Sequence, residues 1–401
     1  MRRHDLDWLR IAAFGLLIGY HVGMLYVPWP FHVKSAYSGG PVLTALMLTL
    51  NPWRLSLLFV ISGAATGYMM RELGRSALAR QRAWRLAVPL LFGMVVVVVP
   101  QVYFEVVDAG RYDGGFLTFW ARYLRGDQTF QTPIPTWNHL WFVAYLLVYT
   151  LLVAACWPRS RIGAALRDDA DAVPLRALLA ALLLGPWVLQ WVLRMTLFPK
   201  FGSNHALIGD WYNHALYFGM FAFGLLLARR PVWWRAIDRL RWPALAMAVL
   251  GAAVFITLAV GYQAGSSNDA GFVALTRAAR EAQAWGAVLA ALGFAQRHLN
   301  HDHRWRAYLV DAVFAYYIVH QTALIALAMW LKPLRLGGGI EAPLVIGGTV
   351  LACGVAAEVA RRVAWLRPLF GFRARPAAGR VSRPSRPRAS PPGPTSSSRR
   401  R

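Results

Sequence analysis

Long apolar runs separated by short arginine-rich loops constrain this 401-residue chain more than any other feature. Hydrophobic residues make up 57% of the sequence and charged residues only 15%. Several runs approach the roughly 20 residues that a helix needs to cross a bilayer. A spanning segment must satisfy its backbone hydrogen bonds internally, which favours helices. The sequence therefore predicts an all-α, polytopic membrane protein whose first partner is the lipid bilayer.

The net charge of +25 lies mainly in the loops between apolar runs and in the C-terminal tail. This placement is typical of cytoplasmic loops and argues against nucleic acid as a partner. The first run lacks a small-residue cleavage site and is expected to stay as a helix. With an interfacial helix at 41–53, about ten spans and two cytoplasmic termini are predicted. The spans are 8–27, 54–70, 86–107, 137–157, 177–197, 212–228, 243–262, 282–294, 307–331 and 343–365.

The chain divides into two parts by composition. Residues 1–372 hold all the apolar runs and are expected to form one membrane-embedded domain. Residues 373–401 contain nine arginines, no acidic residue and many prolines and serines. Such a segment cannot bury a core, so a disordered cytoplasmic tail is predicted. Two interpretations of this tail remain open: it is attracted to anionic lipid headgroups, or it is simply a solvated run of charges.

The first apolar run carries ionisable residues. Asp7 and Arg10 stand at its start, and His21 lies eleven residues after Arg10. At about 100° per residue this spacing puts Arg10 and His21 on one helix face, roughly 16 Å apart along the axis. Asp7 can pair with Arg10 three residues later. Ionisable groups inside a span normally face the bundle interior or a watery cavity, which indicates a functional helix.

Structural interpretations of the same residues remain open. Arg10 can extend to the headgroups with its charge in water. His21 can hydrogen-bond a neighbouring helix without further function. The functional hypothesis is a charged anchor at one membrane depth and a proton-accepting group at another.

A second basic pattern precedes the third span. Arg82 and Arg85 lie three residues apart in RAWR, so on a helix they share a face near the cytoplasmic boundary. Arginine binds phosphate through two parallel hydrogen bonds, and a cytosolic polyphosphate ligand would suit this site. Membrane topology alone also explains arginines in such a loop.

Motifs for other chemistries do not occur in the sequence. It contains no P-loop, no HExxH motif and no zinc-type Cys/His spacing, so neither a metal nor a permanently bound cofactor is expected. No GxSxG nucleophile elbow occurs either. An enzyme with this sequence is expected to use a histidine as general base.

Several motifs in order resemble one family. These are DxxR and His21 in the first span, FVISGAATGYMM, RAWRLAVP, HLWFVAYLLVY, YLVDAVFAYYIVHQ and a glutamate in the last span. The order is similar to that of the acyltransferase 3 family of polytopic membrane acyltransferases, over roughly residues 4–372. HLWF, the YxVH element and AWLRPLFGFR resemble the glucans biosynthesis protein C branch, which is associated with succinylation of periplasmic glucans.

The resemblance implies a function and roles for single residues. An acetyl or succinyl group would pass from cytosolic acyl-CoA, a co-substrate, to a hydroxyl of a cell-envelope glycan at the bacterial inner membrane. His21 would be the catalytic base, with Arg10, Arg82 and Arg85 at the donor site. Supporting positions would be Asp7, Ser62, His320 and Glu358.

Other interpretations accompany these roles. Glu358 has Arg361 and Arg362 in reach for a helix-end ion pair, and His320 suits a packing role beside Tyr317. His139 is expected to anchor the membrane interface, with donation to a reaction oxyanion as an alternative. The branch often has two histidines where this chain has His320 followed by glutamine, which weakens the glucan assignment. Buried ionisable residues also fit a transporter of a saccharide or lipid-linked precursor.

Overall fold

The computed structural model describes residues 3–156, 173–263 and 269–372. Within these ranges every regular element is helical, which confirms the all-α class. The predicted tail at 373–401 lies outside the described residues. The helices are α1 (His4–Gly23), α2 (Gly40–Leu50), α3 (Arg54–Glu72), α4 (Arg75–Phe92), α5 (Val99–Asp108), α6 (Phe116–Leu124), α7 (Trp141–Cys156), α9 (Leu175–Thr196), α10 (Phe198–Phe201), α11 (Trp211–Leu227), α12 (Pro231–Gln263), α13 (Ala270–His298), α14 (Arg306–Leu331), α15 (Gly338–Arg362) and α16 (Leu366–Leu369).

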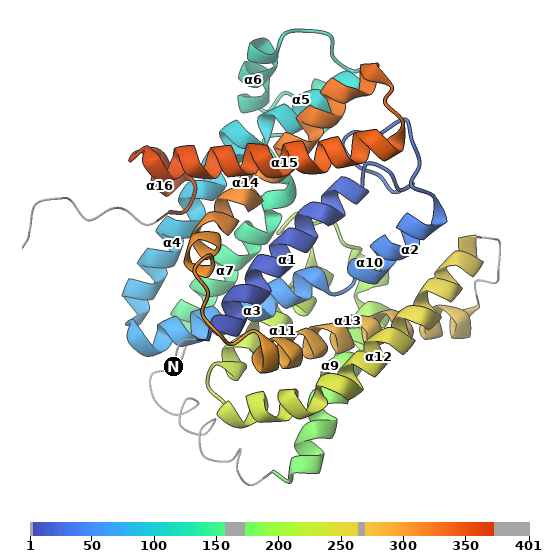
Figure 1. The fold of residues 1–401 in the computed structure, drawn as a ribbon, viewed down its shortest axis with the longest axis vertical. Helices are drawn as coiled ribbons and strands as arrows, with labels where there is room; N and C mark the ends of the chain where they lie inside the picture. The colour runs from blue at the N-terminus through green and yellow to red at the C-terminus, as the bar shows by residue number, and fades with distance from the viewer. Residues whose placement is uncertain (1–2, 157–172, 264–268, 373–401) are drawn as a thin grey trace, which may run out of the picture.

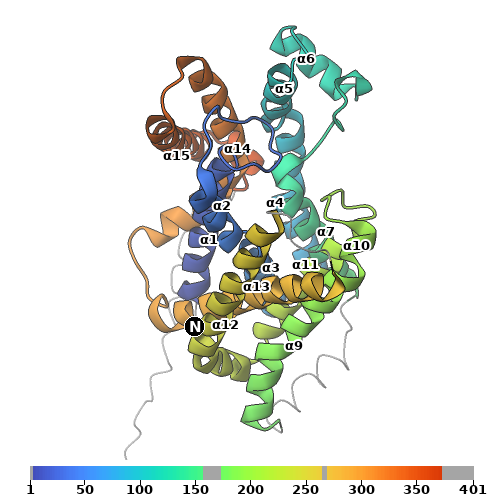
Figure 2. The ribbon, with the colours of Figure 1, turned by 90° about the vertical axis from the view of Figure 1, so that its right-hand side faces the viewer.

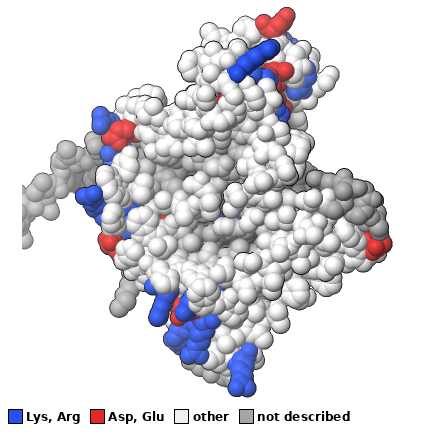
Figure 3. All heavy atoms as spheres, turned by 45° about the vertical axis from the view of Figure 1, so that its right-hand side comes forward, with Lys and Arg blue, Asp and Glu red and all other residues white. Residues whose placement is uncertain are grey.

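Seven helical segments in the described ranges are long and apolar enough to cross a membrane. They are Gly40–Glu72, Arg75–Asp108, Asn138–Cys156, Leu175–Thr196, Pro231–Val260, Arg306–Leu334 and Gly338–Arg362. In the space-filling view, charged side chains lie along the edges of the face and its middle is nearly free of them (Figure 3). These features describe a multi-pass membrane protein. The count of ten spans and the cytoplasmic termini stay predictions.

Helix α1 occupies the middle of the bundle. It packs on α3, α13 and α14, and α14 in turn packs on α15 (Figure 1). Helices α12 and α13 form the longest paired contact, and α5 and α6 lie at the opposite end of the molecule (Figure 2). Because α3, α13 and α14 all contact α1, side chains on different faces of α1 point into different parts of the protein interior.

Helices α3 and α11 approach each other at backbone distance. A Cβ atom on Gly63 would lie 2.0 Å from the carbonyl oxygen of Phe221, and one on Gly224 would lie 2.1 Å from that of Val60. Only glycine fits both positions, as at other close helix crossings in membranes. The SG motif of the second span thus fixes the distance between α3 and α11, and α3 begins with Arg54 at the wall of a cavity.

The third predicted span is longer than expected and contains an irregular turn. The prediction began it at residue 86, whereas α4 begins at Arg75 and carries both arginines of the RAWR motif. A π-helical segment, η1 (Gly93–Val97), joins α4 to α5. It precedes Pro100, which has no N–H to donate to the preceding turn, and such wide turns accommodate that loss.

Two other helices begin earlier than the spans predicted for them. The eighth span was placed at 282–294, but α13 begins at Ala270 because the Asp269 side chain accepts a hydrogen bond from the N–H of Phe272 at 2.7 Å. This cap starts the helix twelve residues earlier and brings its amphipathic turn inside the bundle. The seventh span was placed at 243–262, but α12 begins at Pro231, and Pro243 lies within it.

Candidate functional site

Two histidines from distant parts of the chain meet inside the bundle. The Nδ1 atom of His21 on α1 lies 2.8 Å from the Nε2 atom of His320 on α14. Their rings are nearly parallel, with centroids 5.0 Å apart. The side chain of His320 is fully buried. The sequence predicted functional interest at both positions but not their contact.

Hydrogen bonding assigns the tautomers of this pair. The Nδ1 atom of His320 lies 2.7 Å from the backbone oxygen of Tyr317, which can only accept. The Nδ1 of His320 therefore carries the proton, and its Nε2 accepts from the Nδ1–H of His21. This leaves a lone pair on the Nε2 of His21, for which the described part of the chain offers no hydrogen-bond partner. A neutral imidazole arranged in this way is a base held in place by a second residue.

His139 adjoins the pair, but its own nitrogens are engaged. Its Nε2 lies 3.1 Å from the carbonyl oxygen of Ile318, and its Nδ1 lies 3.3 Å from the amide nitrogen of Gln101. The hydroxyl of Tyr317 donates to the backbone carbonyl of His139. His139 is buried and crosses the His320 ring edge-on at 5.0 Å. It is thus a buried support for α14 and not the interface anchor that the sequence favoured, and its N–H is not available to an oxyanion.

His21 of this pair lines a cavity of about 420 Å³, which we call the histidine cavity. Its volume falls in the range of small-molecule sites. The walls come from α1, α3, α7, α9, α11, α13 and α14. The polar or aromatic residues among its lining include His21, His139, Tyr20, Asn51, Arg54, Asn138, Trp141, Arg194, His205, Asn213 and Arg280.

A second cavity, of about 140 Å³, contains the predicted donor residues. Arg10, Arg82 and Arg85 line it, together with Asp7 and Ser62. We call it the RxxR cavity. The structure thus brings together five residues that the sequence selected from three separate motifs.

Each arginine of the RxxR cavity is tethered on one side. Arg10 donates to the carbonyl of Val310 at 2.8 Å, Arg82 to the hydroxyl of Thr66 at 3.0 Å, and Arg85 to the carbonyl of Gly371 at 3.5 Å. The Nε atoms of Arg10 and Arg82 are buried without a hydrogen-bond partner in the described residues. Unsatisfied buried N–H groups are costly, so these donors suit an anionic ligand.

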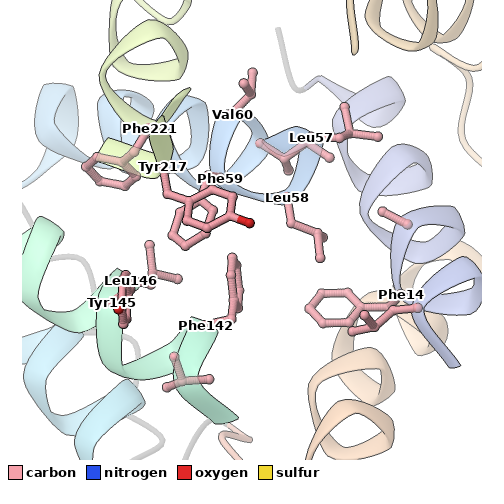
Figure 4. Close-up of a cluster of buried hydrophobic side chains, with 14 of the residues drawn as sticks. Phe14, Leu57, Leu58, Phe59, Val60, Phe142, Tyr145, Leu146, Tyr217 and Phe221 are labelled. Carbon is pink, nitrogen blue, oxygen red and sulfur yellow. The ribbon is translucent and has the colours of Figure 1, made fainter. Parts of the chain in front are cut away.

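An aromatic partition separates the two cavities. Phe142 lines both of them, Phe14 lines the RxxR cavity and Tyr317 lines the histidine cavity. The Phe14 ring lies 5.2 Å from Tyr317 and 6.5 Å from Phe142, between centroids. Figure 4 shows Phe14 pointing from α1 toward the ring of Phe142, which extends from α7. These three rings therefore lie where the two cavities adjoin.

Asp7 and Glu358 lie near helix ends and form ion pairs there. Asp7 accepts a hydrogen bond from Arg306 at 2.6 Å, which ties α1 to α14 in addition to any effect on Arg10. Glu358 lies 2.9 Å from Arg361 and 3.0 Å from Arg362 and lines neither cavity. The helix-end ion pair considered for Glu358 is therefore the arrangement in the structure.

Sequence reasoning missed the arginines of the histidine cavity. Arg54, Arg194 and Arg280 all line it. Arg54 was taken only as the start of the span 54–70, and Arg280 lies just before the predicted span 282–294. An arginine directly after NPW at the head of an apolar run was the available signal.

A loop at 202–210 closes one side of the histidine cavity. His205 stacks on Trp141 with ring centroids 4.0 Å apart. Burial lowers the pKa of His205 to about 4, although the nearby Asp210 carboxylate acts to raise it. The imidazole is therefore neutral at physiological pH. Within the described ranges, no group of three His, Cys, Asp or Glu side chains is arranged to hold a metal ion.

Comparison with known proteins agrees with this geometry. A family model described as "Acyltransferase domain", that of acyltransferase 3, matches residues 3–358. Glucans biosynthesis protein C of Escherichia coli O6:K15:H31 (strain 536) is 23% identical over 340 residues, which cover 83% of this chain and 84% of that protein. The K12 protein has the same identity and coverage, and the O157:H7 protein is 22% identical with equal coverage. No solved structure matches the chain. The chain belongs to the acyltransferase 3 family and is a multi-pass membrane acyltransferase.

Proposed function

We propose that this acyltransferase moves an acetyl or succinyl group from cytosolic acyl-CoA to a hydroxyl of a cell-envelope glycan, at the bacterial inner membrane. One observation carries the proposal. A base, His21, and an arginine cluster line two neighbouring cavities that share the Phe142 ring as a wall. This arrangement suits a reaction in which donor and acceptor approach from different sides.

The RxxR cavity is the proposed donor site. Coenzyme A carries several phosphate charges, and three guanidiniums suit them, two of which (Arg10 and Arg82) have an unpartnered Nε among the described residues. At about 140 Å³ the cavity is smaller than a typical drug-sized site, so only part of the donor would enter it. The adenosine would remain outside, the phosphates would meet the arginines, and the acyl-bearing arm would extend toward the partition.

His21 is the proposed general base. Its Nε2 takes the proton of the acceptor hydroxyl while the hydroxyl oxygen attacks the thioester carbonyl. The tetrahedral intermediate collapses by breaking the C–S bond, and the departing thiolate receives the proton from His21. The His320 lone pair accepts the Nδ1–H of His21 throughout, which stabilises the transient imidazolium.

The histidine cavity is the proposed acceptor site. Its volume of about 420 Å³ has room for a sugar, and its walls combine aromatic rings with amide and guanidinium donors. The relatives' name, glucans biosynthesis protein C, supports a glucan as the acceptor. The transporter hypothesis has no separate support, because the chain belongs to an acyltransferase family.

Turnover by purified protein in lipid nanodiscs tests the proposal. Free CoA release would be followed with acetyl-CoA and with succinyl-CoA, with and without a glucan, and the glucan analysed by mass spectrometry. The expected result is acceptor-dependent CoA release with the matching mass added to the glucan. Binding of acyl-CoA without transfer to any glucan would overturn the acceptor assignment. Absence of acyl-CoA binding would overturn the donor assignment.

A further inference from the structure

We propose that Arg54, Arg194 and Arg280 form an anion-binding subsite in the histidine cavity, and that it holds a negatively charged group carried by a substrate. The inference rests on the proposed function for one point only, namely that the ligand is a substrate. It narrows the substrate class to an acyl group or a glycan that bears an anionic group such as a carboxylate.

Arg54 is the central residue of this subsite. Its side chain is only 7% exposed, and its Nε is buried without a hydrogen-bond partner in the described residues. No ion pair joins Arg54 to a carboxylate within the part of the chain that the structure describes. Its contacts with neutral groups include a hydrogen bond of 2.9 Å from Nη1 to the carbonyl of Asn51 and the Tyr20 ring, 3.4 Å from the guanidinium carbon. A buried cation without an anion is costly, so a ligand that supplies one is a physical reason to keep it.

The backbone adds positive potential at the same point. Arg54 is the first residue of α3, and the first turn of α3 contains no acidic residue. A helix N-terminus carries partial positive charge and favours anions. An arginine at this end places its positive charge beside the partial positive charge of the helix N-terminus, with no carboxylate in the first turn to offset the repulsion. The guanidinium and the helix N-terminus both favour an anion in the cavity.

Arg194 and Arg280 share a single carboxylate. Glu281 lies 2.5 Å from Arg280 Nη1 and 3.4 Å from Arg194 Nε, and it is 1% exposed. Arg194 also donates to the Tyr212 hydroxyl at 2.8 Å. Two guanidiniums on one carboxylate leave one positive charge in excess, besides that of Arg54.

The other buried carboxylate near this wall has neutral partners. Asp210 accepts hydrogen bonds from the Tyr145 hydroxyl at 2.5 Å, from the Asn213 amide at 2.8 Å and from the backbone N–H of His205 at 3.0 Å. These donors satisfy its oxygens, and no described ion pair links it to an arginine. The three arginines therefore retain a positive excess that an incoming anion would neutralise.

The subsite lies beside the proposed base. Tyr20, whose ring lies under the Arg54 guanidinium, immediately precedes His21 on α1, and both line the histidine cavity. An anion on Arg54 would thus hold either the acyl group or the glycan close to His21. Both sources present the same chemistry, so the test includes one probe for each.

Binding of small probes without CoA tests the subsite apart from catalysis. Monomethyl succinate represents a carboxylated acyl group and methyl glucuronide represents an acidic sugar, with dimethyl succinate and methyl glucoside as neutral counterparts. Saturation-transfer NMR on the protein in nanodiscs would measure their affinities. We expect one of the two anions, and neither neutral counterpart, to bind the native protein. The anion that binds identifies the source.

Substitution then assigns the binding to Arg54. Arg54→Met is expected to weaken binding of the anion at least tenfold. Arg54→Lys keeps the positive charge but loses the paired N–H donors of the guanidinium, so it should weaken binding severalfold. Arg335→Met removes an exposed arginine and should bind as the native protein does. Arg54→Met is expected to melt no lower than the native protein, because an uncompensated buried charge is removed. If Arg54→Met does not fold, Arg54→Lys decides the outcome.

Two results would overturn the subsite: native protein that binds neither anion, or native-like binding in both Arg54 variants. Failure of the proposed function is distinguishable from either. Protein that binds the anion through Arg54 but turns over no acyl-CoA would retain the subsite and remove the acyl-transfer assignment.

Discussion

His21 Nδ1 lies 2.8 Å from His320 Nε2, although 299 residues separate the two histidines in the chain. Because the Nδ1–H of His320 donates a hydrogen bond to the Tyr317 carbonyl, the Nε2 of His320 can only accept a hydrogen bond from His21. The contact therefore fixes which nitrogen of His21 faces a substrate as a base. His320 is by this geometry a positioning residue that acts through His21.

Substitution of His320 separates positioning from packing. His320→Ala is expected to lower kcat on the order of 10²-fold, because His21 loses the acceptor that holds its tautomer. In His320→Gln the side-chain oxygen can still accept from Nδ1 of His21, so a substantial part of kcat should return. The pH–rate profile should shift in His320→Ala and stay near the native profile in His320→Gln. Equal kcat and equal profiles in both variants would reduce His320 to a packing residue.

Loss of either RxxR arginine should weaken donor binding. A hydrogen bond to a charged group contributes about 1.5–3 kcal/mol, so Arg82→Ala and Arg85→Ala should each raise KM for acyl-CoA roughly 10–100-fold. At saturating donor, kcat should change little, because neither residue lines the histidine cavity. Arg80→Ala removes an exposed arginine of the same helix as a control. A KM in Arg82→Ala no higher than in Arg80→Ala would exclude Arg82 from the donor site.

Opening the partition should uncouple donor cleavage from transfer. Phe142→Ala removes the ring shared by both cavities, so water would reach the thioester more easily. We expect CoA release without acceptor to rise severalfold, and Phe142→Trp to slow transfer. Phe221→Ala removes the same atoms from a buried position that lines neither cavity. If Phe221→Ala raises acceptor-free release equally, loosened packing and not the partition is the cause.

Acidification should loosen the loop at 202–210. The folded-state pKa of His205, about 4, lies below the unfolded value of about 6.5. The folded state therefore favours the neutral ring, and this contribution to stability is complete above pH 6.5 and is lost as the pH falls toward 4. The native melting temperature should fall more between pH 7 and pH 5 than that of His205→Gln. His301→Gln, at an exposed histidine, is the control and should follow the native protein.

The helical class could be predicted from the sequence, and so could His21 and the arginine pair Arg82 and Arg85 as candidate site residues. Apolar length predicts helices, and three-residue spacing correctly put Arg82 and Arg85 on one helix face, now seen on α4. The His21–His320 contact was not predictable, because no local pattern links residues on α1 and α14. Arg54 was missed because charge at the head of an apolar run is also typical of membrane topology. The start of α13 was missed because one side chain, Asp269, decides it.

The most direct test of the account is the rate of acceptor-dependent CoA release in His21→Ala. Because a positioned general base contributes typically 10²–10⁴-fold, kcat should fall by about that factor. Acyl-CoA binding should stay at the native level, since Arg10, Arg82 and Arg85 line a separate cavity. A purified, folded His21→Ala protein that transfers acyl groups within threefold of the native rate would contradict the account.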